Sequence, residues 1–257
     1  MTTPFYQPTG AEREVFLHAF HCHLPLLLKG PTGCGKSRFV ESMAAELGRP
    51  VVTVACNDET TAADLIGRWL IRGGDTVWQD GPVLTAIRQG AILYMDEVAE
   101  AREDVIVVLH PLTDYRRRLF VDRLNEEFAA PEGFMLVASF NPGYRHGLKE
   151  LKPSTRQRFL ALQFGYPQPT VEASILVRET GIDAKRADQL VALARKIRAL
   201  HELGLAETVS TRLLVDAAQL LCRGLAPRIA IAAAVVQPLT DDDSIGRALQ
   251  DVVDLMF

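Results

Sequence analysis

The sequence predicts an α/β protein in which a five-stranded parallel sheet lies between helices, followed by a small helical domain. Up to about residue 166, short apolar segments alternate with amphipathic ones, as expected for strands joined by crossover helices. A glycine-rich turn separates the first of these apolar segments from the amphipathic segment after it. Beyond this region only helical periodicity remains.

The five candidate strands are short, and several are apolar almost throughout, which is typical of parallel strands covered on both faces. They are Leu24–Leu28, Val51–Ala55, Ala91–Met95, Phe134–Phe140 and Phe159–Phe164. The candidate helices between them are Ala11–His21, Lys36–Leu47, Val83–Gln89 and Asp104–Leu112. Two segments interrupt the alternation: 67–81, with Gly73-Gly74 and both tryptophans, predicts a loop insertion, and 113–130 predicts a hairpin.

Pro167 and Pro169 break helical structure and predict an extended linker between two domains. We therefore expect an α/β core over residues 1–166 and a helical domain over residues 171–257. The candidate helices of the second domain are Val171–Thr180, Ala184–Leu203, Thr211–Cys222 and Pro227–Val236.

Composition excludes several classes of function. The net charge of −4, from 28 basic and 32 acidic residues, argues against a dedicated nucleic-acid binder. The four cysteines are widely spread without a C-x-x-C pair, which favours a reducing compartment over a disulfide framework. Apolar runs are too short to span a bilayer, and the first residues lack the pattern of a signal peptide. We therefore expect a cytoplasmic protein.

The glycine-rich turn carries a phosphate-binding pattern, G-x-x-x-x-G-K-S. It reads Gly30-Pro31-Thr32-Gly33-Cys34-Gly35-Lys36-Ser37 and continues with Arg38. This spacing places backbone N–H groups around an anion at the start of a helix. We expect Lys36 to reach the β- and γ-phosphates of ATP and the Ser37 hydroxyl to ligate Mg²⁺. Cys34 is interpreted as a small residue at a permissive position, with a thiol whose oxidation blocks binding as the alternative.

An apolar strand ending in two acids follows some sixty residues later. ATP hydrolysis requires a carboxylate near Mg²⁺ and a polar group that orients the attacking water. Asp96 fits the first role and Glu97 the second. Asn141 ends another candidate strand and would meet the γ-phosphate if that strand lay beside the one before the phosphate loop. The alternative for Asn141 is a turn former, because Pro142 and Gly143 follow it.

These motifs, together with the helical C-terminal domain, resemble an AAA+ ATPase, and more narrowly the CbbQ/NirQ/NorQ branch of the MoxR ATPases. The resemblance covers essentially the whole chain. The stretches that carry it are Leu28–Glu41, Val77–Pro82, His110–Asp114, Asn141–Tyr144, Leu151–Phe159 and Val209–Leu214.

The resemblance implies a ring, usually a hexamer, with ATP between subunits. Arg156 and Arg158 match the region that supplies arginine fingers in trans, with Arg158 the first choice and a rim salt bridge the alternative. Arg212 matches the sensor-2 arginine, with a surface helix arginine as the alternative. The two insertions match segments that face the ring pore, where Arg68, Trp69 and Trp78 would contact a substrate or partner; the alternative for the tryptophans is packing of the insertion.

The resemblance also implies an activator of other enzymes. The first expectation is a motor that works with a von Willebrand factor A (VWA) domain adaptor, similar to CbbO, and releases inhibitory sugar phosphates from Rubisco. The second keeps the motor but takes a nitric oxide or nitrite reductase as its client. A third expectation, from another class, is a scaffold that binds ATP with negligible turnover.

Overall fold

The computed structural model describes residues 4–142, 151–200, 205 and 207–257. Contacts divide these residues into two compact units. The first contains residues up to 30, 36–142 and 151–163, and the second contains 31–35 and the described residues from 164 onward.

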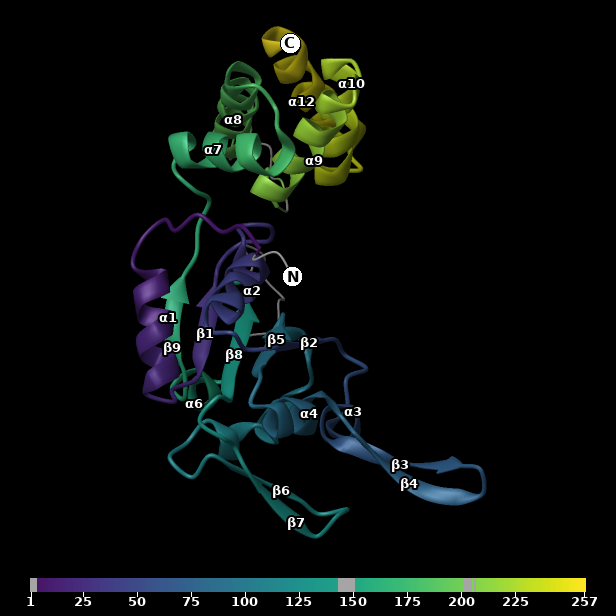
Figure 1. Cartoon of the computed structure of the whole chain (residues 1–257). Helices are drawn as coiled ribbons and strands as arrows, with labels where there is room; N and C mark the ends of the chain where they lie inside the picture. Colours follow the sequence, from purple (N-terminus) through teal and green to yellow (C-terminus); the bar gives the residue numbers. More distant parts are fainter. Residues whose placement is uncertain (1–3, 143–150, 201–204, 206) are drawn as a thin grey trace. The chain divides into compact units, whose positions relative to one another are not determined.

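A five-stranded parallel sheet forms the centre of the first unit, with strand order β2-β5-β8-β1-β9 (Figure 1). Its strands are β1 Leu26–Lys29, β2 Val51–Ala55, β5 Ile92–Asp96, β8 Met135–Phe140 and β9 Leu160–Gln163. All five begin and end within two residues of the bounds expected from the apolar segments, and β2 matches them at both ends. The predicted fold class is therefore confirmed.

The central strands are buried on both faces, which explains their apolar sequences. All of β8 is buried, and Leu26, Leu27 and Leu28 of β1 are at most 1% exposed. The helices of this unit are α1 Glu12–His21, α2 Lys36–Glu46, α3 Ala62–Ile66, α4 Pro82–Gln89, α5 Glu103–Val107 and α6 Pro153–Arg156. The α5 helix is shorter than expected, because the chain turns after Val108 and continues as a 3-10 turn over His110–Leu112.

Both insertions are antiparallel hairpins that project away from the sheet (Figure 1). The hairpin expected over 113–130 consists of β6 Arg118–Val121 and β7 Glu126–Ala129. The prediction of a loop over 67–81 is wrong, because β3 Gly67–Arg72 pairs there with β4 Asp75–Asp80. Gly73 and Gly74 connect the strands with φ of 63° and 94°, the left-handed conformation that a two-residue hairpin turn requires. Apolar residues on both faces of the hairpin hid the strand alternation.

The second unit is helical around its own apolar core. Its helices are α7 Pro169–Thr180, α8 Ala184–Ala199, α9 Thr211–Cys222, α10 Pro227–Ile231, a π-helical turn Ala232–Val236, α11 Gln237–Leu239 and α12 Asp243–Met256. Side chains cap three of them, since Asp183, Ser210 and Asp242 accept hydrogen bonds from backbone N–H groups of α8, α9 and α12.

A buried ion pair joins three of these helices. Glu172 of α7 is 0% exposed and accepts two hydrogen bonds from Arg198 of α8, at 2.7 and 2.8 Å. Its Oε1 also accepts the hydroxyl of Thr211, the first residue of α9, at 2.6 Å. Arg198 donates in addition to the carbonyl oxygen of Val209 and lies over the Tyr166 ring. The start of α9 is thus fixed against α7 and α8.

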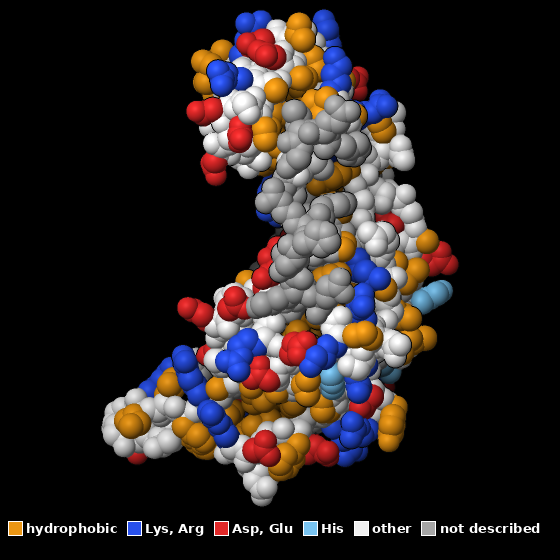
Figure 2. Space-filling model, turned by 180° about the vertical axis from the view of Figure 1, so that it is seen from behind, with side chains coloured by type: hydrophobic (Ala, Val, Ile, Leu, Met, Phe, Trp, Pro, Cys, Tyr) orange, Lys and Arg blue, Asp and Glu red, His pale blue; other side chains and the backbone are white. Residues whose placement is uncertain are grey.

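Basic and acidic side chains are interspersed on the molecular face in Figure 2, in keeping with the nearly balanced charge. Within the described ranges, no helix combines the length and the apolar character needed to cross a membrane.

We predict that Glu172→Gln lowers the free energy of unfolding of the second unit by about 3 kcal/mol, because the Arg198 charge loses its buried partner. Denaturant unfolding followed by far-ultraviolet circular dichroism measures this change. The matched control is Asp254→Asn in the exposed pair with Arg228, whose side chains are 43% and 57% exposed. That change should cost less than about 1 kcal/mol. Equal losses in the two variants would contradict the structural importance of Glu172.

Candidate functional site: residues at the carboxyl ends of the central strands

Three segments of the predicted site follow neighbouring strands. The phosphate loop follows β1, Asp96 ends β5, and Asn141 follows β8, which pairs with both of the other strands. Because parallel strands end at the same edge of a sheet, the carboxyl ends of β1, β5 and β8 lie at one edge. The strand bearing Asn141 does lie beside the strand before the loop, as the sequence argument for its role requires.

The phosphate loop leads directly into α2, which begins at Lys36. Gly33 and Gly35 adopt φ of 68° and 98°, a conformation in which a side chain would be strained. Lys36 is 9% exposed, and its Nζ donates to the carbonyl oxygen of Gly30 at 2.7 Å. Further along α2, Arg38 forms an exposed ion pair with Glu41. The loop thus has the backbone path and the buried cation that a phosphate site needs.

A network of hydroxyl groups connects the loop to Asp96. The Tyr94 hydroxyl lies 3.1 Å from Ser37 Oγ and donates to Asp96 Oδ1 at 2.7 Å. Ser139 of β8 donates to the same carboxylate oxygen at 2.6 Å. Ser37 and Asp96, the two residues predicted to hold magnesium, therefore share the phenol oxygen of Tyr94 as a neighbour.

Glu97 has a left-handed backbone, with φ 53° and ψ 49°. Residues other than glycine rarely adopt this conformation, and it is found most often where the surrounding structure enforces it. Here the backbone N–H of Glu97 donates to Ser139 Oγ at 2.8 Å. The residue predicted to orient water is thus held by its main chain at the end of β5.

Negative charge is concentrated at this edge of the sheet. Burial raises the pKa of the Cys56 thiol to about 12, and the charges of Asp96 and Glu97 add to the increase. Burial also raises the pKa of the Tyr94 phenol above its usual value. A cation placed between the loop and these carboxylates would be attracted by their charge.

The predicted arginines lie in two places. Arg156 ends α6 and is exposed, whereas Arg158 follows it and is partly buried. The Nε of Arg158 is buried without a hydrogen-bond partner among the described residues, and its Nη1 lies 3.9 Å from Asp114. Asp114 is also paired with Arg116 at 2.6 Å. Hydrogen bonds from Arg116, with a contribution from the Arg158 charge, lower the pKa of Asp114.

Arg212 is the second residue of α9 in the helical unit, and it is exposed. Because the start of α9 is fixed by Thr211 and Glu172, the backbone of Arg212 is fixed within that unit as well. Of the stretch Asn141–Tyr144, the last two residues lie outside the described part of the chain.

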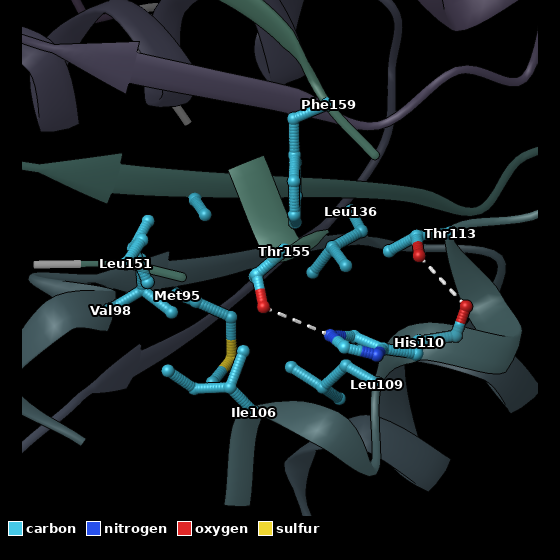
Figure 3. A pocket seen from close by; sticks show the side chains of 11 residues that line it. Met95, Val98, Ile106, Leu109, His110, Thr113, Leu136, Leu151, Thr155 and Phe159 are labelled. Atoms are coloured by element: carbon cyan, nitrogen blue, oxygen red, sulfur yellow. Dashed lines mark hydrogen bonds between the residues drawn. The ribbon is translucent and has the colours of Figure 1, made fainter. Parts of the chain in front are cut away.

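A small apolar pocket links the Asp96 strand to the arginine segment (Figure 3). Met95 and Phe159, the neighbours of Asp96 and Arg158, both line it. His110 Nε2 and Thr155 Oγ1 are 3.2 Å apart at its rim. Burial and the Arg158 charge lower the pKa of His110, which favours a neutral imidazole. We interpret the pocket as packing, because its lining carries too few polar groups to orient a ligand.

The sequence analysis missed two residues of the site, Tyr94 and Ser139. Each is a hydroxyl-bearing residue in an otherwise apolar strand, two positions before a predicted site residue. Side chains two apart in a strand point to the same face. A polar residue at that spacing was the signal that could have found them.

The residues at this edge fit a magnesium–nucleotide complex. Mg²⁺ prefers oxygen ligands, typically one or two from protein side chains with phosphates and water completing the shell. Ser37 and Asp96 supply such oxygens, and both lie beside the hydroxyl of Tyr94. Lys36 is the first residue of α2, the helix that also carries Ser37.

Comparisons with known proteins identify the family of the chain. Residues 25–159 match the family described as AAA domain (dynein-related subfamily), and residues 172–256 match the family described as CbbQ/NirQ/NorQ C-terminal. Protein NorQ of Paracoccus denitrificans is 59% identical over 99% of this chain and 94% of its own. Protein CbbQ of Hydrogenophilus thermoluteolus is 51% identical over 99% of this chain and 95% of its own. Denitrification regulatory protein NirQ of Pseudomonas aeruginosa is 53% identical over 98% of this chain and 97% of its own.

A solved structure of a RuvB mutant from Thermotoga maritima is similar with a TM-score of 0.57, over 96% of this chain and 70% of that one. At 16% identity this likeness shows the fold alone. The fold and the phosphate loop define a P-loop NTPase of the AAA+ class. Within that class, the chain belongs to the CbbQ/NirQ/NorQ family of MoxR-type AAA+ ATPases, as its sequence motifs predicted.

Proposed function

We propose that this protein is a magnesium-dependent ATPase whose hydrolysis cycle remodels a client enzyme. The observation that carries the proposal is the hydrogen-bonded arrangement of Ser37, Tyr94 and Asp96 beside the phosphate loop, with Glu97 held next to it. In this proposal residues 30–38 bind the phosphates, and Ser37 and Asp96 hold Mg²⁺. When bound, the ion would neutralise charge on the β- and γ-phosphates.

The protein's own groups perform the remaining tasks. Lys36 contributes a positive charge at the β- and γ-phosphates. Glu97 orients the attacking water and accepts its proton, and its strained backbone supports a fixed orientation for that carboxylate. Asn141 directs its amide toward the water and the γ-phosphate from the neighbouring strand.

We further propose that the site is completed by a neighbouring subunit in a homo-hexameric ring. In this arrangement Arg158, or Arg156 in its place, supplies positive charge in trans, and Arg212 reports the bound nucleotide to the helical domain. The guanidinium of Arg158 is partly buried, its Nε has no hydrogen-bond partner within the described part of the chain, and its Nη1 lies 3.9 Å from Asp114, whereas Arg156 is exposed; this difference supports Arg158 as the finger. The core over residues 1–166 and the lid over residues 171–257 are the two bodies that this cycle would move.

The proposal also names the client enzyme on which the protein acts. The 59% identity with NorQ, against 51% with CbbQ, favours a nitric oxide or nitrite reductase as the first client to test. Rubisco, activated together with a CbbO-like VWA-domain adaptor, is the second candidate, because the CbbQ match spans as much of the chain. We place this work in the cytoplasm, without a nucleic-acid partner.

Glu97→Gln should lower ATP turnover by at least about 100-fold, because the amide cannot accept a proton from water. ATP affinity should remain within about threefold, since the loop is unchanged. Steady-state phosphate release and equilibrium binding of a fluorescent ATP analogue measure the two effects. Lys36→Ala is the matched control and should lose binding itself. Equal turnover of wild type and Glu97→Gln would favour the ATP-binding scaffold instead.

Arg158→Ala should lower turnover by about 1000-fold while ATP binding is retained, because charge developing on the γ-phosphate loses its partner. Mixing this variant with Glu97→Gln subunits should restore part of the activity. In mixed rings, some sites combine an intact Glu97 with an intact Arg158 from the neighbour. A second mixture, in which Arg156→Ala replaces Arg158→Ala, identifies which of the two arginines acts in trans. A mixture as inactive as its components would rule out the trans arrangement.

The client can be isolated with Glu97→Gln as a trap, since this variant should retain ATP and therefore its bound client. We expect reductase subunits to be enriched when the tagged variant is purified from its native cells and the bound proteins are identified by mass spectrometry. Lys36→Ala, processed in parallel, should lose them. Enrichment of Rubisco instead would reverse the order of the two candidates.

A further inference from the structure

The hydroxyl group of Tyr94 stands between the two side chains assigned to magnesium. It lies 3.1 Å from Ser37 Oγ on α2 and 2.7 Å from Asp96 Oδ1 at the end of its own strand. The Tyr94 side chain is 2% exposed, so the surrounding core holds its ring and leaves the hydroxyl little freedom. A buried phenol needs a hydrogen-bond partner, and here it has one on each side.

The hydrogen atoms of this chain of contacts can be assigned from the chemistry of the groups. An ionised carboxylate only accepts hydrogen bonds, so the single Tyr94 proton goes to Asp96. Tyr94 must then accept from Ser37, so the serine proton points toward the phenol oxygen. Donating this proton does not use the lone pairs of Ser37 Oγ, so they remain available to a cation.

Ser139 restrains the same carboxylate from the neighbouring strand. It is 0% exposed, donates to Asp96 Oδ1 at 2.6 Å and accepts from the Glu97 backbone N–H at 2.8 Å. Tyr94 and Ser139 therefore fix one oxygen of Asp96 from two directions. Only Tyr94, however, also reaches the phosphate-loop helix.

We propose that Tyr94 is a positioning residue for the magnesium site, whose hydroxyl holds Ser37 and Asp96 in the orientation that binds the cation. The inference rests on the proposed nucleotide function and adds a residue to it. Hydrogen-bond partners of metal ligands orient those ligands, and their loss typically weakens metal affinity about 10- to 100-fold. A phenol that only fills the core would not change magnesium affinity selectively.

The test is Tyr94→Phe, which removes the hydroxyl and keeps the buried ring. The probe is a fluorescent methylanthraniloyl-ATP, bound to the full-length protein without Mg²⁺ and then titrated with MgCl₂. We expect the half-saturating Mg²⁺ concentration to rise about tenfold or more, while affinity for the magnesium-free nucleotide stays within about twofold. The control is Tyr115→Phe, because Tyr115 is 94% exposed; it should change neither constant.

A second variant, Ser139→Ala, should also raise the half-saturating Mg²⁺ concentration, since Asp96 loses its other restraint. Partial misfolding lowers the amplitude of both titrations but leaves the ratio of the two constants unchanged, and the thermal midpoint is measured alongside. An unchanged Mg²⁺ constant in Tyr94→Phe would overturn the inference, as would equal weakening with and without Mg²⁺. Absence of nucleotide binding by the wild type would instead overturn the proposed function.

Discussion

The order of the strands β5, β8 and β1 in the parallel sheet is the constraint on which the candidate site depends. It brings together Ser37 at the start of α2, residues 94–97 and Ser139, which are far apart in the chain. Leu27 pairs with Ala138, and Met95 pairs with the same residue from the other side. The strands are buried, so a shift in the register of one would expose apolar residues and separate the site residues together.

Polar groups inside this apolar sheet are tolerated because each has a partner. Leaving a buried hydroxyl unpaired costs about 1–3 kcal/mol, so Tyr94 and Ser139 would weaken the sheet if they stood alone. They instead pair with Asp96, Ser37 and the backbone of Glu97. The Asp96 carboxylate and the Glu97 backbone are therefore held by groups of the core.

Packing also connects the site to the residues proposed to act on a neighbour. Met95 and Phe159 line one apolar pocket, so the strand that ends at Asp96 and the segment that carries Arg158 share a boundary (Figure 3). In the helical unit, Glu172 and Arg198 perform a comparable task for the start of α9. In each unit, buried contacts outside the site fix the backbone of a segment that carries one of the arginines proposed to act on the nucleotide.

The sequence by itself determined the fold class, the phosphate loop, the five strands of the sheet and the family, because each depends on local spacing or on apolar periodicity. It also predicted the 113–130 hairpin, whereas the 67–81 hairpin was missed because apolar residues on both faces removed the alternation. The roles of Glu97, Asn141 and the arginines stay predictions. Only the tertiary structure brought Tyr94 and Ser139 to Asp96, since hydrogen bonds between neighbouring strands and a helix depend on strand order, which no local pattern encodes.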